Sequence, residues 1–169
     1  FALFMNSMYA VDAYVRDYFR KAVLDALLAE KLPVTVFGEG WEKYSCGDEH
    51  SLRREPAVPF ALSFERIAKA HVLLNVSPIF NRGMHDRVPA GMANHAVVLT
   101  DENPYLRRTF TDGKELLFYS LEKPDTLFEQ AERALTDVRL REKIAASAYE
   151  TFEREYTWKH LSLIHISEP

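Results

Sequence analysis

The first apolar residues of the chain recur at helical spacing. From residue 11 to residue 28 an apolar residue returns every three or four positions, while Arg16, Arg20 and other charged residues fill the opposite face. This pattern predicts an amphipathic helix. Pro33 then precedes a β-branched run at 34–37 that stops at a glycine-rich turn. We therefore expect a helix, a strand and a tight turn in this order.

The next part of the chain has a weaker pattern. Residues 41–56 are polar and show no clean period, which predicts a loop. A short strand is possible at 58–60, and Ser63 is a candidate N-cap for a helix over 64–69. The apolar run 71–76 then predicts a buried strand.

The second half alternates strands with helices. Asp86 is a candidate N-cap for a helix that ends near Ala93, with Pro89 in its first turn. The apolar strand segments have no polar face, which favours a parallel sheet covered by helices on both sides. The further expected elements are strands at 96–100 and 114–119, a short helix ending at 108, and helices at 126–135 and 138–154.

Length and composition narrow the possible functions. The 169 residues suit one domain, and 47% hydrophobic with 27% charged residues are typical of a globular protein. A net charge of -4 gives no electrostatic reason to expect nucleic-acid binding. The longest apolar runs have strand length, so no membrane span is expected. Cys46 has no cysteine to pair with, which fits a cytoplasmic location, and the scattered histidines predict no metal site.

Both ends of the chain are unusual. The sequence starts at Phe1 without an initiator methionine, which suggests that an upstream portion is missing. Residues 162–169 resemble translated adapter sequence, so we expect one native domain over 1–161 followed by a non-native tail. The alternative is a natural helical turn that continues from Trp158.

Ligands of open parallel sheets bind beyond the carboxyl ends of the strands, which selects the loops at 38–41, 75–87 and 100–104. The second loop begins at Asn75 and places Gly83, His85, Asp86 and Arg87 just before a helix. Arginine and free backbone amides suit a phosphate there. The alternative is a surface pair of Asp86 with Arg87 and a packed His85.

The other two loops carry weaker signals. Gly38-Glu39-Gly40 lacks the third glycine of a dinucleotide-binding motif and is also explained by a tight turn. Trp41 is a candidate to stack on a base or sugar, although a tryptophan beside a strand end is usually part of the core. Asp101 is a candidate acceptor for sugar hydroxyl groups, or an acidic residue before a helix.

Three stretches resemble a known family when they are taken together: Leu74-Asn75-Val76-Ser77-Pro78, Met84-His85-Asp86-Arg87-Val88, and Ala96-Val97-Val98-Leu99-Thr100-Asp101. With Val36-Phe37-Gly38-Glu39-Gly40-Trp41 they are similar to the group 1-like glycosyl transferases of the spore-maturation type. The resemblance implies a Rossmann-like, three-layer α/β domain, the C-terminal half of a GT-B fold. Its implied role is to bind a nucleotide-diphosphate sugar for metal-independent transfer to an acceptor.

The resemblance also implies roles and partners. His85 and Arg87 would lie near the diphosphate, and residues 38–41 near the nucleotide. No cofactor is implied beyond the donor sugar, and the N-terminal acceptor domain is the missing partner, so this fragment alone is expected to bind without turnover. Relatives carry a ribose-binding glutamate and a glycine where this chain has Ala90 and His95, and Asn94 is not assumed to compensate.

Two alternatives to a donor-binding domain stay open. Ala90 favours a non-catalytic or degenerate Rossmann-like domain that uses the cleft for binding or for regulation. A flavodoxin-like or receiver domain would show a similar alternation of strands and helices. A receiver needs an acidic cluster and a lysine on a later strand, which the sequence does not supply.

Overall fold

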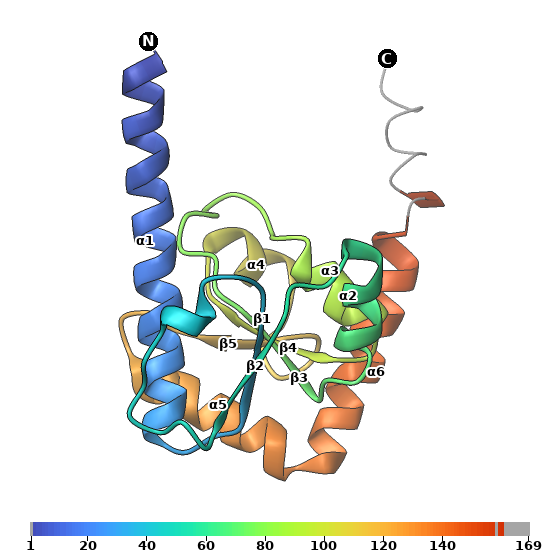
Figure 1. Cartoon of the computed structure of the whole chain (residues 1–169). Helices are drawn as coiled ribbons and strands as arrows, with labels where there is room; N and C mark the ends of the chain where they lie inside the picture. Colours follow the sequence, from blue (N-terminus) through green and yellow to red (C-terminus); the bar gives the residue numbers. More distant parts are fainter. Residues whose placement is uncertain (1, 158, 161–169) are drawn as a thin grey trace, which may run out of the picture.

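The computed structural model describes residues 2–157, 159 and 160, and they form an α/β domain (Figure 1). The predicted tail at 162–169 and the alternative at Trp158 lie outside the described residues. The elements are α1 (Ala2–Ala29), β1 (Val34–Phe37), a 3-10 helix (Trp41–Lys43), β2 (Leu52–Glu55), α2 (Phe60–Ile67), β3 (Val72–Asn75), α3 (Arg87–Ala93), β4 (Val97–Asp101), α4 (Pro104–Thr109), β5 (Leu117–Tyr119), α5 (Pro124–Thr136) and α6 (Val138–Glu155).

A three-stranded parallel sheet in the order β3-β4-β5 forms the centre of the domain. Leu74 of β3 is in register with Leu99 of β4, which is in register with Leu117 of β5. Successive residues of a strand point to opposite faces, so Leu99 packs in one core cluster and Val98 in the other. Both residues are fully buried, as predicted for a sheet covered on two sides.

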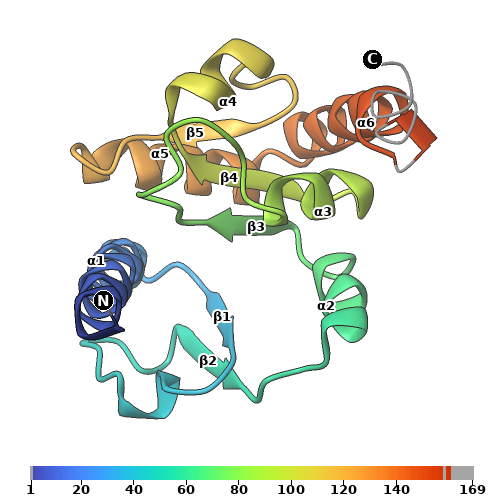
Figure 2. The ribbon, with the colours of Figure 1, turned by 90° about the horizontal axis from the view of Figure 1, so that it is seen from above.

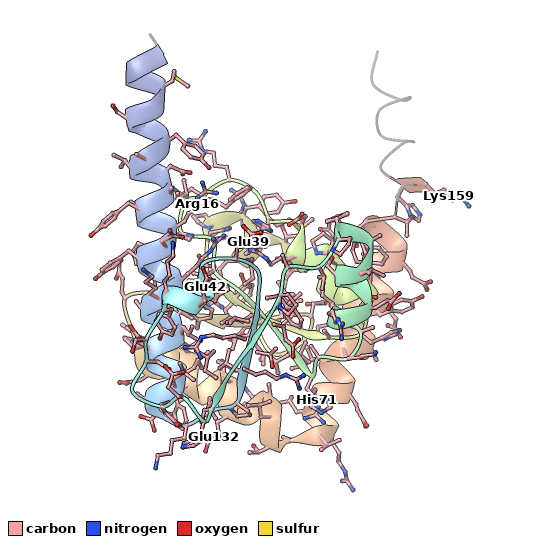
Figure 3. All side chains as sticks on the ribbon, viewed as in Figure 1. Arg16, Glu39, Glu42, His71, Glu132 and Lys159 are labelled. Atoms are coloured by element: carbon pink, nitrogen blue, oxygen red, sulfur yellow. The ribbon has the colours of Figure 1, made fainter. Side chains whose placement is uncertain are left out.

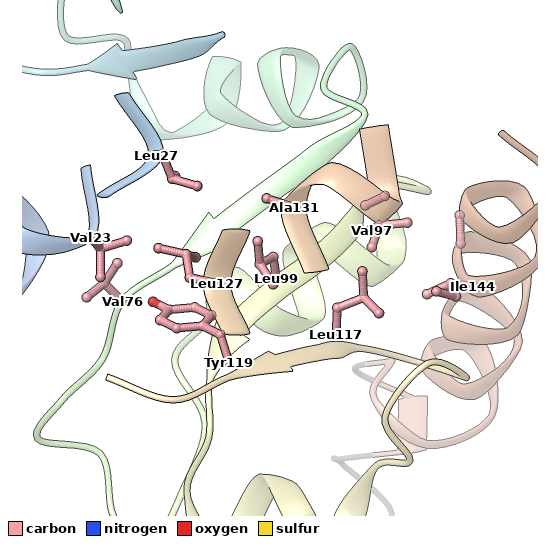
Figure 4. Packing of buried hydrophobic residues seen from close by; sticks show 12 residues of the cluster. Val23, Leu27, Val76, Val97, Leu99, Leu117, Tyr119, Leu127, Ala131 and Ile144 are labelled. Carbon is pink, nitrogen blue, oxygen red and sulfur yellow. The ribbon is translucent and has the colours of Figure 1, made fainter. Parts of the chain in front are cut away.

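Helices cover each face of this sheet (Figure 2). On one face, Val23 of α1 and Leu127 of α5 pack with Leu99 and Tyr119 (Figure 4). On the other face, α3, α4 and α6 supply the cover. These two layers of helices around the sheet confirm the predicted three-layer α/β class. The second cluster includes Val88, Met92, Leu106, Phe110, Phe118 and Ala148.

A second, smaller sheet departs from the prediction of a single sheet. Strands β1 and β2 pair in parallel with each other and have no ladder to β3. One face of the pair packs on α1, where Leu24 and Leu28 contact Leu52, Val34 and Tyr44 in a third cluster. Thr35 and Phe37 point to the opposite, exposed face of β1.

Strand β2 lies inside the segment that was predicted to be a loop, so that prediction is wrong for residues 52–55. Its sequence, Leu-Arg-Arg-Glu, holds a single apolar residue, and only Leu52 is buried. An edge strand with one buried side chain shows no period of apolar residues. The backbone pairing with β1, from Val34 with Leu52 to Phe37 with Glu55, defines the strand instead.

Helix α2 begins earlier than predicted. Pro59 is its N-cap and Phe60 its first residue, so the predicted strand at 58–60 is absent. Proline fits the start of a helix because it has no amide hydrogen to leave unpaired there. Ser63 lies within the helix and does not cap it, since its hydroxyl donates to the carbonyl of Phe60 at 2.6 Å.

Two other boundaries differ from their predictions. Helix α1 starts at Ala2, because residues 2–10 include alanine, leucine and methionine and hold neither glycine nor proline. Strand β5 is shorter than the predicted 114–119, because Gly113 at φ 72 turns the chain and the strand pairs only from Leu117. Among the described residues no helix is long and apolar enough to cross a membrane.

Candidate functional site

The carboxyl ends of β3 and β4 meet in a buried polar network. The amide nitrogen of Asn75 donates to the hydroxyl of Thr100 at 3.0 Å, and the Ser77 hydroxyl donates to the Asn75 amide oxygen at 3.1 Å. The hydroxyl of Tyr119 donates to the Asn75 carbonyl at 2.9 Å. Asn75 is 1% exposed, so its side chain is held in one orientation by Thr100 of β4 and by Ser77 of the following loop, and Tyr119 of β5 holds its backbone.

Asp101 ends β4 beside this network. Its carboxylate accepts a hydrogen bond from the backbone amide of Ser77 at 2.8 Å, which joins the loop after β3 to the end of β4. Burial raises the pKa of Asp101 to about 6, and the hydrogen bond from Ser77 opposes the shift. Asp101 therefore carries a carboxyl group that titrates just below neutral pH in a largely buried position.

Arg87, the first residue of α3, points to the same network. Its guanidinium lies 3.4 Å from the Asn75 amide oxygen. Within the described part of the chain no carboxylate lies within 4.0 Å of this guanidinium, and the residue is half-buried. Burial lowers the pKa of Arg87, and so does the charge of Arg20. The charge of Asp86 opposes this shift of the Arg87 pKa without forming a direct ion pair in the described residues.

His85 precedes Arg87 by two residues and packs edge-on against Phe80, with ring centroids 5.7 Å apart. Burial and the Arg87 charge lower the pKa of His85, while Asp86 opposes them. The imidazole is thus neutral at pH 7. Asp86 occupies the predicted N-cap position, but its side chain does not cap the helix and lies against Nδ1 of His85. The predicted N-cap position is confirmed, but the side-chain cap is missing because Asp86 already has helical backbone angles.

Asn103 fixes the loop that carries these residues. It is the N-cap of α4, where its side-chain oxygen accepts from the amide of Leu106 at 2.8 Å. Its side-chain nitrogen donates to the carbonyls of Phe80 at 2.6 Å and Gly83 at 3.2 Å. One side chain thereby connects the end of β4 to Phe80 and to the bend at Gly83, a role that the sequence pattern did not indicate.

A cavity of about 1110 Å³ lies between the β1–β2 pair and β3. Apolar residues of β1, α2 and β3 line most of it, and His85, Asp86 and Arg87 line it as well. Arg20 of α1 also lines this cavity. The sequence pattern assigned Arg20 only to the polar face of a helix; its position three residues before the buried Val23 was the signal that could have found it.

The turn after β1 is less clearly part of the site. Trp41 lines the cavity, but its ring also packs with the third cluster and stands edge-on to Tyr44. Gly38 and Gly40 have φ of 121 and 90, as a tight turn requires. The exposed Glu39 lies toward the same end of the molecule as Arg16 (Figure 3). No contact joins Gly38, Glu39 or Gly40 to the Asn75–Asp101 network in the described residues.

The two positions that depart from the family pattern, Ala90 and His95, and the nearby Asn94 have clear local roles. Ala90 presents a methyl group to the cavity beside Arg87. The Asn94 side chain donates to the Ala90 carbonyl at 2.8 Å, so it is committed to ending α3. His95 has a φ of 56, a conformation that favours glycine, and its ring stacks on Tyr149 at 4.1 Å. Neither Asn94 nor His95 replaces the absent carboxylate.

The described residues contain no group of three or more histidine, cysteine, aspartate or glutamate side chains that could hold a metal ion. The polar groups at the carboxyl edge are instead an amide, a carboxyl with a raised pKa and the cationic Arg87. This set suits hydrogen bonds to hydroxyl groups and an ion pair with an anion.

The sequence matches a family model described as glycosyl transferase-like over residues 16–162. None of the curated proteins matches the sequence. Among solved structures, HepE from Anabaena in complex with UDP-glucose is similar, with a TM-score of 0.70 and 12% identity over 86% of this chain and 44% of that chain. The complex of the same protein with UDP gives a TM-score of 0.70 at 11% identity over the same shares of the two chains.

A third solved structure is similar to this chain over nearly the whole of its own length. The C-terminal domain of a glycosyl transferase group 1 family protein, LpcC from Francisella tularensis, has a TM-score of 0.50 and 12% identity over 79% of this chain and 92% of that chain. These likenesses confirm the predicted Rossmann-like α/β fold. The chain spans 44% of the length of the HepE chain.

Proposed function

The chain belongs to the glycosyl transferase-like family, and we propose on this premise that its cavity binds a nucleoside-diphosphate sugar. Proteins of this fold include HepE, which was solved with UDP-glucose and with UDP. The fold alone does not assign a ligand to this chain. The proposal therefore rests on the residues that the fold brings to the carboxyl edge of β3 and β4.

The observation that carries the proposal is the position of Arg87. Its guanidinium is half-buried, lines the cavity and lies beside an amide oxygen, and among the described residues no carboxylate forms a direct ion pair with it. Holding a cation away from water costs free energy unless an anion pairs with it directly. A bound diphosphate supplies the missing charge, and the planar fork of arginine pairs with two phosphate oxygens at once.

The chemistry of glycosyl transfer gives this arrangement a purpose. When the bond between sugar and diphosphate breaks, negative charge develops on the leaving phosphate. Arg87 stabilises that charge, and the neutral His85 offers a hydrogen bond beside it. We propose that this cationic loop takes the place of a metal ion, so that donor binding is metal-independent and needs no cofactor.

The remaining candidate residues surround the proposed diphosphate site. We propose that Asp101 accepts hydrogen bonds from sugar hydroxyl groups; it is buried at the end of β4 beside Asn75 and does not itself line the cavity. Trp41 contributes an aromatic wall to the cavity next to the proposed nucleoside position. We assign the turn at 38–40 to the nucleotide only through its closeness in sequence to Trp41.

Transfer of a sugar requires a site for the acceptor as well as a site for the donor. The donor site described above has no candidate acceptor site beside it in the described residues, and the chain spans 44% of HepE. We propose that the protein binds its donor without transferring the sugar unless an acceptor-binding half is present. A cytoplasmic location, where nucleotide sugars are available, is part of the same proposal.

A degenerate binding domain is the second candidate, and Ala90 favours it. The methyl group of Ala90 faces the cavity one turn from Arg87, where the family pattern has a ribose-binding glutamate. Without that carboxylate the ribose loses two hydrogen bonds. Ala90→Glu distinguishes the candidates, because it should strengthen binding of UDP more than binding of 2′,3′-dideoxy-UDP if the nucleotide still binds in this place.

Calorimetric titration with UDP, GDP and UDP-glucose tests the proposal, with and without EDTA. We expect one nucleotide to bind equally well with and without EDTA. Arg87→Ala should weaken the binding of that nucleotide by about 2 kcal/mol, or roughly 30-fold in Kd. Arg108→Ala removes an exposed arginine of α4 and is the matched control. A folded wild-type chain that binds no nucleotide would contradict the donor-site assignment.

A further inference from the structure

We propose that Arg20 of α1 is a further phosphate-binding residue of this cavity and that it selects for the diphosphate over the monophosphate of the donor nucleotide. This inference rests on the proposed function. It concerns a helix that lies before the first strand, far in sequence from the loop at 77–87. The other proposed phosphate-binding residues, His85 and Arg87, both come from the segment that leads into α3.

The packing of α1 against the larger sheet places Arg20 beside the cavity. Val23 is buried in the same cluster as Val76, the residue just after β3, and Tyr119, the last residue of β5 (Figure 4). Residues three apart on a helix lie on the same face. Arg20 therefore extends from the turn of α1 that precedes this contact, and it lines the cavity together with His85 and Arg87.

The charges around the cavity do not balance in the absence of a ligand. Arg20 lowers the pKa of both His85 and Arg87, which shows that the like charges act on one another across the site. Arg20 forms an ion pair with Asp17, whose carboxylate is 3.9 Å away and largely exposed. Such an exposed pair is weak. Asp86 opposes the effect of Arg20 on both pKa values, and it is the one acidic residue among the described residues that line the cavity. Two arginines that share a cavity with a single carboxylate mark a place where an anion binds.

The arrangement of the two arginines suggests what the anion is. Arg87 is anchored beside Asn75 at the end of β3, whereas Arg20 comes from α1 on another wall of the cavity. We expect the phosphate of a nucleoside monophosphate to pair with Arg87. A second phosphate extends the negative charge toward α1, where Arg20 pairs with it. Loss of Arg20 should thus weaken UDP binding more than UMP binding.

The test compares the affinities of UDP and UMP for the wild-type chain, Arg20→Gln and Lys21→Gln. Lys21 is the neighbouring cation on α1; it is exposed and does not line the cavity. We expect Arg20→Gln to weaken UDP about tenfold and UMP less than threefold, as fits one lost ion-paired hydrogen bond. Lys21→Gln should change neither.

Two outcomes separate this inference from the proposed function. If the wild-type chain binds UDP and Arg20→Gln binds both nucleotides as Lys21→Gln does, the role of Arg20 is wrong and the donor site stands. If the folded wild-type chain binds neither nucleotide, both proposals fail. Arg20→Lys keeps the charge without the fork and should give an intermediate UDP affinity, which also guards against a folding defect of Arg20→Gln.

Discussion

The two sheets of this domain are built from similar short strands but differ in how they are covered. The strands β4 and β5 are buried along their whole length between two layers of helices. In β1 alternate residues are half-buried and exposed, and one face packs on α1. Burial on both faces gives the larger sheet most of the apolar area that stabilises the domain.

The difference also separates two kinds of candidate binding residue. At the carboxyl edge of the larger sheet, Asn75 and Asp101 are buried and joined to the following loop by hydrogen bonds. At the edge of the smaller sheet, Glu39 and Gly40 lie in an exposed turn. Side chains held by a packed scaffold keep a fixed geometry for a ligand. The larger sheet is therefore where we place the chemistry, and the smaller sheet supplies a wall.

The largest expected contrast is between Leu99→Ala in β4 and Leu52→Ala in β2. Leu99 is 1% exposed in the main cluster and Leu52 is 6% exposed in the third cluster, which covers one face of its sheet. We expect losses of unfolding free energy of about 4 and about 2 kcal/mol. Urea unfolding measures both, and equal losses would show that the sheets are equally well packed.

The next contrast concerns charge. The folded pKa of Asp101, about 6, exceeds its ordinary 3.8 because the group is buried. The stabilising effect of the protonated form is complete below about pH 4 and is lost as the pH rises through 6. Two pKa units correspond to roughly 3 kcal/mol. Asp101→Asn keeps an acceptor for the Ser77 amide without a charge.

We therefore expect the unfolding free energy of Asp101→Asn, relative to wild type, to rise by up to about 3 kcal/mol between pH 4 and pH 7. Urea midpoints across this range measure it. Glu39→Gln removes an exposed carboxylate at the edge of the smaller sheet and should follow the wild-type curve. Parallel curves for Asp101→Asn and wild type would mean that the buried carboxyl titrates normally.

Substitution of one glycine near each sheet tests the same difference in packing. A methyl group on Gly91 of α3 would lie 2.4 Å from Val98 Cγ2 and 3.0 Å from Leu73 Cδ2, so the helix rests directly on the larger sheet. Gly91→Ala should cost about 2 kcal/mol despite its better helix propensity. Gly47→Ala, with no atom within 4 Å, should change stability by less than about 0.5 kcal/mol. Thermal unfolding of the two variants measures both changes in stability.

The same contrast explains which parts of the fold could be predicted from the sequence. Strands β3 and β4 each begin with an unbroken apolar run, so their positions followed from composition alone. Strand β2 holds one buried leucine among charged residues, and its backbone pairing with β1 leaves no trace in an apolar pattern. The separation of the two sheets also has no local signal, because it depends on which strand edges pair in space.

The candidate site divides in a similar way. The loop with His85 and Arg87 was predictable because ligands of parallel sheets bind at the carboxyl ends of the strands. Arg20 was not singled out, since a polar residue on an amphipathic helix normally faces solvent. The role of Asn103 depends on contacts with carbonyl groups about twenty residues away, which no local motif encodes.

Asn103→Ala gives the smallest expected effect and compares the anchoring of the two loops. Asn103 accepts from Leu106 and donates to the Phe80 and Gly83 carbonyls, whereas the exposed Glu42 accepts one hydrogen bond, from the Gly40 amide at 2.7 Å. We expect a loss of about 1 kcal/mol for Asn103→Ala and a few tenths for Glu42→Ala.

Hydrogen exchange locates the effect of each change. Asn103→Ala should speed exchange in the loop at 77–87, because the bend at Gly83 loses its connection to β4. Glu42→Ala should affect only the turn after β1. If Asn103→Ala leaves the loop at 77–87 as protected as in wild type, the hydrogen bonds of Ser77 to Asn75 and Asp101 hold that loop by themselves.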